Sequence, residues 1–189
     1  ELEKPGLTPF GFSVVERMNE LGMVVDVSHS APATIADVLR TTTKPVLNSH
    51  SGSRVLAPKP QNLWDDQIRA MADNGGVVAV HFCSRLVLGV NDRQAAIDDV
   101  IRQIQYMVNV GGIDTVAIGP DWVLGNPDRD RHYLRNTSQE HLTWTKGLES
   151  SAEVGNLLPA LENAGFASPE MEKVVGANLL RLFSDVLPG

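Results

Sequence analysis

Four polar residues lie at or just beyond the ends of four short apolar runs of the chain: His29, His50, His81 and Asp121. Neutral imidazole and carboxylate groups are the usual protein ligands of zinc-like ions, and a catalytic zinc keeps one position open for water. In α/β barrels, side chains at the strand ends collect on one face, where the βα loops lie. Each residue alone is more often structural or solvated, but their succession predicts a metal-dependent site.

His29 and His50 are the most specific pair, because each follows a serine at the end of a predicted strand. Neighbouring strands lie ~4.8 Å apart, so both imidazoles could bind one shared ion. The alternative is that each histidine only caps its strand by hydrogen bonding. The residues by themselves leave both interpretations open.

Asp121 lies between Pro120 and Trp122. We expect a buried carboxylate there, able to accept a proton or to bind an ammonium group. A turn or helix-capping aspartate is the alternative. His81 is predicted to be a core histidine, or one that supports a metal ligand, rather than a ligand itself.

Two further residues lie near these strand ends. Asp26 stands inside an apolar run shortly before His29, where it either orients a metal ligand through a hydrogen bond or bonds to a helix. Cys83 is predicted to be a small buried apolar residue rather than a nucleophile. As the single cysteine, it excludes an intrachain disulfide, so nothing requires an oxidising compartment.

The apolar runs predict strands near 23–29, 45–50, 76–82 and 115–121. They are apolar throughout rather than alternating, which is typical of strands covered on both faces in a parallel sheet. Apolar residues at helical spacing, Pro near the starts and Gly at the ends predict the helices. These helices span about 8–22, 30–39, 63–74, 93–110, 151–164 and 169–187. A long polar loop is expected over 124–145, with a solvated charged stretch at 128–131.

Helix–strand units in series, joined by long crossovers, imply a parallel α/β sheet. Four such units are half of a TIM-type (β/α)₈ barrel, which typically needs ~250 residues. We therefore expect residues 1–189 to supply about half of such a barrel. Half a barrel leaves two open sheet edges and an exposed interior. A second polypeptide completing the barrel, or a homo-oligomer, is the expected consequence.

The composition excludes several classes of protein. The chain has 189 residues, a formal charge of −7 and 42% hydrophobic residues, a balance that suits a globular domain with a core. An acidic chain without a Lys/Arg run is a poor partner for nucleic acid or an anionic membrane. Neither a membrane-spanning run nor a signal-peptide pattern is found, so the cytoplasm is the default location. The chain begins with Glu1, which predicts a processed product or a piece of something longer.

Several motifs occur in a fixed order along nearly the whole chain. They are GLTPFG at 6–11, LGMVVDVSH at 21–29, PVLNSHS at 45–51, Arg54, PQNL at 60–63, NGGVV at 74–78, IGPD at 118–121, KGLE at 146–149 and GANLLRLF at 176–183. In these motifs the chain resembles the C-terminal half of the membrane (renal) dipeptidase family of zinc peptidases.

The resemblance implies a (β/α)₈ barrel of which this chain supplies roughly the last four βα units. It also implies two zinc ions bridged by a glutamate and a water or hydroxide. Members cleave dipeptides, including ones with a D-residue at the C-terminal side, and some open β-lactams. His29 and His50 match the two histidines that bind one of the zincs. Asp121 matches the aspartate that handles the substrate amino group and the proton transfer at the scissile nitrogen. We therefore expect a zinc-dependent dipeptidase acting on dipeptides or similar small molecules.

The chain departs from the family pattern in three ways. The family's His-x-Asp motif and bridging glutamate belong to the N-terminal half, so this chain holds ligands for at most one ion. Gln61 stands where the family usually has an arginine that grips the substrate carboxylate, and the family's Asp-Phe-Asp-Gly reads DWVLG at 121–125. Two alternatives follow: a non-catalytic fragment or degenerate paralogue that binds a ligand or partner chain, and an amidohydrolase-type metal hydrolase with a different substrate.

Overall fold

The computed structural model describes residues 5–90, 92–122 and 143–188. Its elements, in chain order, are α1 (Pro9–Glu20), α2 (Pro32–Thr41), β1 (Leu47–Ser51), α3 (Asp65–Asp73), β2 (Val77–Val80), α4 (Ser84–Leu88), α5 (Ile97–Gly111), η1 (Ile113–Thr115), β3 (Val116–Ile118), η2 (Val154–Asn156), α7 (Leu157–Asn163), α8 (Ser168–Glu172), η3 (Lys173–Ala177) and α9 (Asn178–Val186). None of the described helices is long and apolar enough to cross a lipid bilayer.

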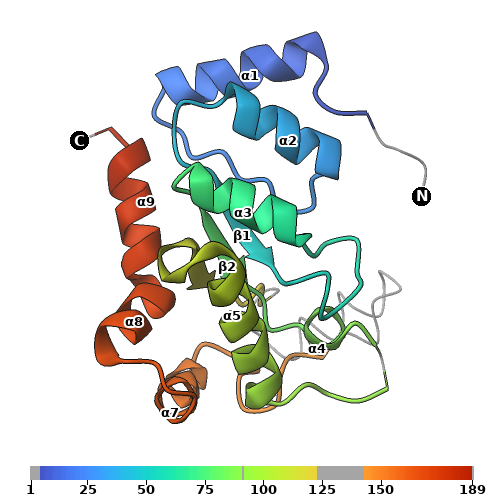
Figure 1. Ribbon diagram of the computed structural model, residues 1–189, viewed down its shortest axis with the longest axis vertical. Coiled ribbons are helices and arrows are strands. Elements are labelled where there is room, and N and C mark those ends of the chain that lie inside the picture. Colours follow the sequence, from blue (N-terminus) through green and yellow to red (C-terminus); the bar gives the residue numbers. More distant parts are fainter. Residues whose placement is uncertain (1–4, 91, 123–142, 189) are drawn as a thin grey trace.

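The strands form a parallel sheet in the order β1-β2-β3, and Figure 1 shows β1 and β2 side by side in it. Leu47 pairs with Val77, and Val78 pairs with Val116. Helices lie between consecutive strands, as parallel connections require. The predicted parallel α/β fold is confirmed. The expectation of a half-barrel is not: in the part of the chain that the structure describes, the strands form a three-stranded sheet.

The strand predicted near 23–29 is reduced to a single parallel bridge between Asp26 and Leu47. The Val27 amide donates to the Leu47 carbonyl at 2.8 Å, and the Leu47 amide donates to the Val25 carbonyl at 3.0 Å. The next amide, that of Ser28, donates instead to the Asp26 side chain, and His29 has a positive φ of 61°. The chain therefore turns away before a strand can extend, although the segment lies beside β1 as expected.

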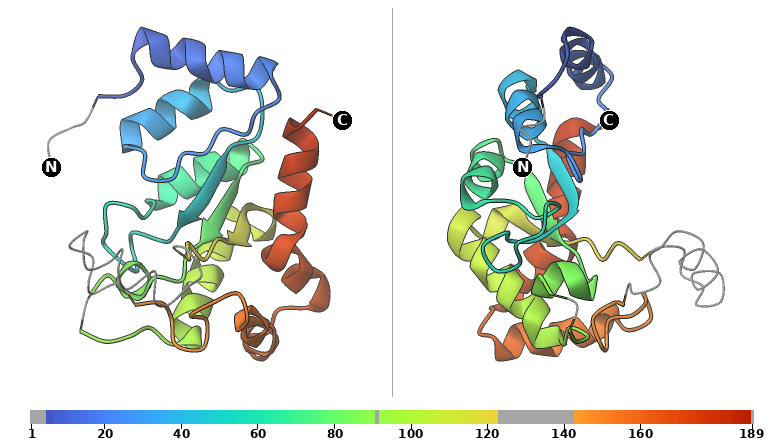
Figure 2. Two further views of the ribbon diagram at one scale, coloured as in Figure 1. Left: turned by 180° about the vertical axis from the view of Figure 1, so that it is seen from behind. Right: turned by 90° about the vertical axis from the view of Figure 1, so that its right-hand side faces the viewer.

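Both faces of the sheet are covered, which explains why its strands are apolar throughout. Val78, Val80 and Val116 belong to the main core, together with Ile68 of α3 and Ile104 of α5. On the opposite face, a second core cluster joins residues of all three strands to α9. Its members are Leu47, Val77, Ala79, Ala117, Leu182 and Val186. Figure 2 shows α3 and α5 on one side of the sheet and α9 on the other.

Most predicted helices form, with shifted ends. α1 begins as expected, with the Thr8 hydroxyl accepting from the Gly11 amide and a proline in the first turn. The short helix α4 was not predicted. The single helix expected over 169–187 is divided into α8, the π-helical segment η3 and α9, and the backbone departs from helical geometry at Gly176. The helix changes its geometry there, and the spacing of apolar residues alone does not reveal such a change.

The predicted loop over 124–145 lies mostly outside the described residues, and so does its charged stretch at 128–131. Its last residues are not a free loop. Ser84 donates its amide to the Thr143 carbonyl, and Thr145 donates its amide to the Phe82 carbonyl, both at 2.8 Å. The chain around Thr145 is therefore held against the segment that follows β2.

Candidate metal centre

The structure brings His29 and His50 together. His50 lies in β1, and His29 follows the segment that bridges to β1. Their ring centroids are 4.9 Å apart, with the ring planes tilted by 55°. The two residues come from separate segments that pair in parallel at Leu47, so their proximity depends on the register of that pairing.

This pair fits one zinc ion. Two imidazoles bound tetrahedrally to one ion, each with a Zn–N distance of about 2.0 Å, have ring centroids about 5 Å apart. The observed spacing of 4.9 Å agrees with that geometry. In the described part of the chain, no group of three or more His, Cys, Asp or Glu side chains is placed to hold a metal. His29 and His50 are therefore two candidate ligands for a single ion.

A hydrogen-bonded chain leads from Asp26 to the His50 ring. Asp26 Oδ2 lies 2.5 Å from the Ser49 hydroxyl, which donates to it. The same hydroxyl oxygen lies 2.9 Å from His50 Nδ1. Partial burial raises the pKa of the Asp26 carboxyl, but hydrogen bonds from Ser49 and Ser28 outweigh this and hold the pKa below 3.8. Asp26 is therefore a carboxylate at neutral pH.

The same carboxylate fixes the backbone that carries both histidines. Asp26 Oδ1 accepts from the amides of Ser28, at 3.0 Å, and Ser49, at 3.1 Å. The Ser28 hydroxyl in turn accepts from the His50 amide at 3.1 Å. Of the two interpretations of Asp26, the described contacts agree with an orienting role beside a candidate ligand, because its partners are serines and not helix residues.

Asp121 follows β3, where the sequence placed it, but it is exposed rather than buried. Its backbone carbonyl accepts from the Trp144 indole at 3.2 Å. It is the adjacent Trp122 that turns inward, donating to the Leu148 carbonyl at 3.0 Å and packing edge-on against Phe82. The expectation of a buried carboxylate was wrong, because apolar neighbours do not determine which side chain the turn directs into the core.

His29 and Asp121 share an unusual backbone. Their φ angles are 61° and 56°, and no other described residue except glycine has a positive φ. Such conformations cost of order 1–3 kcal/mol, and they persist at sites where the surrounding structure enforces them. The sequence also indicates both residues as candidates, His29 for metal binding and Asp121 for proton transfer. Their backbone strain is independent support for a functional site at this edge of the sheet.

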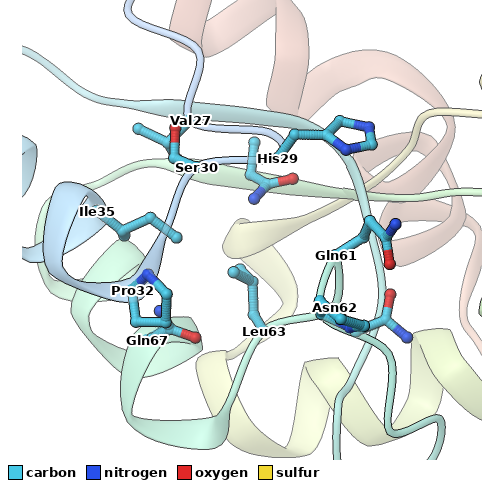
Figure 3. Close-up of a pocket in the computed structure, with 11 residues that line it drawn as sticks. Val27, His29, Ser30, Pro32, Ile35, Gln61, Asn62, Leu63 and Gln67 are labelled. Atoms are coloured by element: carbon cyan, nitrogen blue, oxygen red, sulfur yellow. The ribbon is translucent and has the colours of Figure 1, made fainter. Parts of the chain in front are cut away.

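A pocket opens beside His29, and Gln61 lies on its wall (Figure 3). The Gln61 backbone carbonyl accepts from the Ser51 hydroxyl at 3.0 Å. The remaining lining residues come from Val27 and the turn that follows it, from α2, from β1 and from the 60–67 segment. They are Val27, Ser30, Pro32, Ile35, Asn48, Pro60, Asn62, Leu63 and Gln67. Every lining residue other than His29 is uncharged.

Asn48 and Asn62 are pocket residues that the sequence reasoning missed. Both side chains are buried, and Asn48 Nδ2 has no hydrogen-bond partner within the described chain. A buried amide donor without a partner is available to a ligand acceptor such as a carbonyl or carboxylate oxygen. The signal in the sequence was an asparagine at the end of the apolar run Pro45–Leu47.

His81 is a core residue, as predicted, and is 1% exposed. The Asn62 amide nitrogen donates to the carbonyls of Ala57 and Leu86. Asn62 Oδ1 is therefore the acceptor that faces His81 Nε2 at 3.1 Å, so Nε2 carries the hydrogen. Burial lowers the pKa of His81 to about 3, with smaller contributions from His50 and His29, and the ring is neutral at physiological pH.

We expect acidification to destabilise the metal-free chain through His81. Its pKa is about 3 when folded against 6.5 for a free histidine, so below pH 6.5 only the unfolded state takes up the proton. The stabilisation is complete above that pH and is lost as pH falls, by about 2 kcal/mol between about pH 8 and pH 5. Urea unfolding across this range measures the change. In His81→Gln this contribution to the free energy of unfolding disappears. If that variant lost stability with falling pH as steeply as the unchanged protein, the pH dependence could not be assigned to His81.

Cys83 is buried, as expected. Burial raises the pKa of its thiol above 9.0, so the reactive thiolate is scarce at neutral pH. The structure therefore agrees with a packing role for this residue.

The chain is similar to several known proteins. Residues 1–187 match the family model for membrane dipeptidase, peptidase family M19. The chain is 31% identical over 181 residues to dipeptidase aclJ from Aspergillus oryzae, covering 96% of this chain and 39% of that protein. It is also similar to the crystal structure of an amidohydrolase from Pseudomonas aeruginosa, with 29% identity and a TM-score of 0.86 over 96% of this chain and 57% of the other.

A more distant structural neighbour is a metallopeptidase from Rhodobacter sphaeroides, liganded with a phosphinate mimic of the dipeptide L-Ala-D-Ala. Its TM-score is 0.82 and its identity 22%, over 97% of this chain and 48% of the other. At that identity the likeness supports the fold. The chain thus spans between 39% and 57% of the lengths of these three proteins.

Proposed function

Because the chain belongs to the membrane dipeptidase family, peptidase family M19, we propose that it forms part of a zinc-dependent dipeptidase. The observation that carries this proposal is the His29–His50 pair, with ring centroids 4.9 Å apart at the carboxyl end of β1. In this proposal the two histidines hold one zinc ion. The bound ion would polarise the scissile carbonyl and lower the pKa of a water molecule from about 15.7 towards about 7.

Asp121 is proposed to handle the amino group and the proton at the scissile nitrogen. Its carboxylate is exposed at the end of β3, so substrate can reach it. Its strained φ of 56° and the bond between its carbonyl and the Trp144 indole hold its backbone in place. A general acid–base group positioned in this way contributes about 10²–10⁴-fold to a rate.

The pocket beside His29 is proposed to receive the end of the substrate that bears the carboxyl group. Gln61 and the buried Asn48 both line it, and Asn48 Nδ2 lacks a partner within the described residues. Neutral amides bind a carboxylate more weakly than a bidentate guanidinium does. We therefore propose that Gln61 contributes to substrate binding, with a reduced preference for a charged carboxyl end.

Changing Gln61 to arginine tests that role. We expect the KM for dipeptides to fall about tenfold in Gln61→Arg, since a charge-assisted hydrogen bond is worth about 1–1.5 kcal/mol more than a neutral one. The control is the same dipeptide with a C-terminal carboxamide, which should gain nothing. Equal gains for the acid and the amide would contradict carboxylate recognition at this position.

We propose that the complete active site belongs to a larger barrel. The 26–29 segment, β1, β2 and β3 run parallel and in sequence order, which is compatible with consecutive strands of a (β/α)₈ barrel. Two histidines supply ligands for one ion only. A second zinc would need ligands from further polypeptide, either another part of the same protein or another chain.

One alternative function has a specific observation in its favour. Apart from His29, the pocket is lined by uncharged residues, which would suit a substrate without a free carboxylate. An amidohydrolase-type hydrolase would then use the same metal and Asp121. Comparing free dipeptides with N-acyl and C-amidated substrates distinguishes the two activities.

Elemental analysis combined with mass in solution is the direct test of the proposal. About two zinc ions per particle with dipeptide hydrolysis would support a complete dipeptidase site. One zinc per chain without hydrolysis would assign activity only to an assembly with additional polypeptide. No zinc at any concentration tested would overturn the metal site and favour a non-catalytic protein.

A further inference from the structure

The hydrogen bonds around Ser49 determine which nitrogen of His50 carries its hydrogen. Ser49 has one hydroxyl hydrogen and three neighbours for it: Asp26 Oδ2 at 2.5 Å, His50 Nδ1 at 2.9 Å and the Ser28 hydroxyl at 3.1 Å. An ionised carboxylate has no hydrogen of its own and can only accept. The short contact with Asp26 therefore takes the Ser49 hydrogen.

Because the Ser49 hydrogen points to Asp26, the Ser49 oxygen can act only as a hydrogen-bond acceptor toward His50. A close contact between the Ser49 oxygen and His50 Nδ1 is then favourable only if Nδ1 carries a hydrogen. In the neutral imidazole the other nitrogen, Nε2, must hold the free lone pair. Nε2 is thus left available to coordinate a metal ion.

From this geometry we infer that Asp26 and Ser49 act as a positioning relay that holds His50 in the Nδ1–H tautomer and presents Nε2 to the metal ion. The inference deepens the proposed function and rests on it for the identity of the ligand. The direction of the relay is set by the charge of Asp26, although this carboxylate lies two hydrogen bonds away from the ring. Such outer partners of metal-bound histidines typically affect metal affinity by about 10–100-fold.

The substitution Asp26→Asn is expected to reverse the direction of the hydrogen bonds between residue 26, Ser49 and His50 without breaking them. Asp26 Oδ1 accepts from two backbone amides, those of Ser28 and Ser49, so an asparagine keeps its oxygen there and places its NH₂ group toward the Ser49 hydroxyl. The Ser49 hydrogen is then released to His50 Nδ1, which favours the Nε2–H tautomer. A carboxylate-to-amide change that imposes the wrong histidine tautomer is known to disable a catalytic site while its geometry stays intact.

Two-bond ¹⁵N–¹H correlation spectra of the metal-free protein, labelled on histidine, test the relay directly. We expect His50 to carry its hydrogen on Nδ1 in the unchanged chain and on Nε2 in Asp26→Asn. Zinc titration should show about 10–100-fold weaker binding in the variant. Ser49→Thr keeps the hydroxyl and should retain both the tautomer and the affinity, whereas Ser49→Ala should lose the preference for Nδ1–H.

Ser28→Ala is the matched control. Its hydroxyl contacts Asn48, Ser49 and the His50 amide, but not the His50 ring. A purely structural role of the cluster would make this variant as damaging to zinc affinity as Ser49→Ala, and that result would overturn the relay.

The His50 tautomer in the unchanged protein tests the relay even if a variant fails to fold. If the metal-free protein shows the Nε2–H tautomer and yet binds zinc when the ion is added, the relay is overturned and the proposed function is left intact. An Nδ1–H tautomer without zinc binding would support the hydrogen-bond chain and overturn the proposed function.

Discussion

Replacing either His29 or His50 with alanine should remove one metal ion from the protein. The two rings are the candidate ligands of a single site, 4.9 Å apart, so neither can hold zinc well without the other. Groups that merely support a metal ligand already change affinity by about 10–100-fold, and loss of a ligand should cost at least ~100-fold. Elemental analysis of the purified variants, after dialysis, measures the loss.

The unusual backbone at His29 calls for a second variant. An alanine is strained at its φ of 61°, whereas asparagine adopts positive φ more readily. His29→Asn should therefore lose the metal while retaining its thermal unfolding temperature. Gln61→Ala, beside His29 in the same pocket, should keep the metal. A folded His50→Ala protein that retains as much zinc as the unchanged protein would refute the assignment.

Asp121→Asn should leave the metal content intact and lower kcat by about 10²–10⁴-fold, the range for loss of a positioned acid–base group. Asparagine also tolerates the φ of 56° at this position, so the turn after β3 is expected to persist. The change removes the negative charge and the proton acceptor but not the shape. Steady-state kinetics on a dipeptide, together with zinc analysis of the same sample, separate the two effects.

Asp114→Asn provides the same charge change at the opposite end of β3. Asp114 lies in η1 and pairs with Lys173 on the surface at 2.6 Å, away from the candidate site. The Asp114→Asn protein should hydrolyse dipeptides at the same rate as the unchanged protein. Equal activity of Asp121→Asn and the unchanged protein would exclude the proposed role of Asp121.

The sequence alone predicted the parallel α/β fold, because apolar runs and helical spacing are local properties that burial on both faces of a sheet requires. It also indicated the position of the candidate residues at or beyond the strand ends, since residue type and position after an apolar run can be read directly. His81 and Cys83 were correctly predicted to be buried. These expectations needed no knowledge of which segments meet.

Other features depended on contacts between distant segments. The strand expected near 23–29 is a single bridge. The Asp26 side chain accepts a hydrogen bond from the Ser28 amide, and the positive φ of His29 directs the backbone away from β1. Asp121 is exposed because the turn after β3 sends Trp122 inward instead. Local patterns describe how apolar a segment is, but not which side chain a strained turn directs into the core.

The sequence by itself determined which residues are candidates for the site: His29, His50, Gln61 and Asp121. Only the tertiary structure decided that the two histidine rings face each other and that Ser49 links Asp26 to one of them. Asp26 and Ser49 are far apart in the chain, and a hydrogen bond forms only at one separation and direction. That separation is set by the pairing register at Leu47, a property of the folded sheet rather than of either segment.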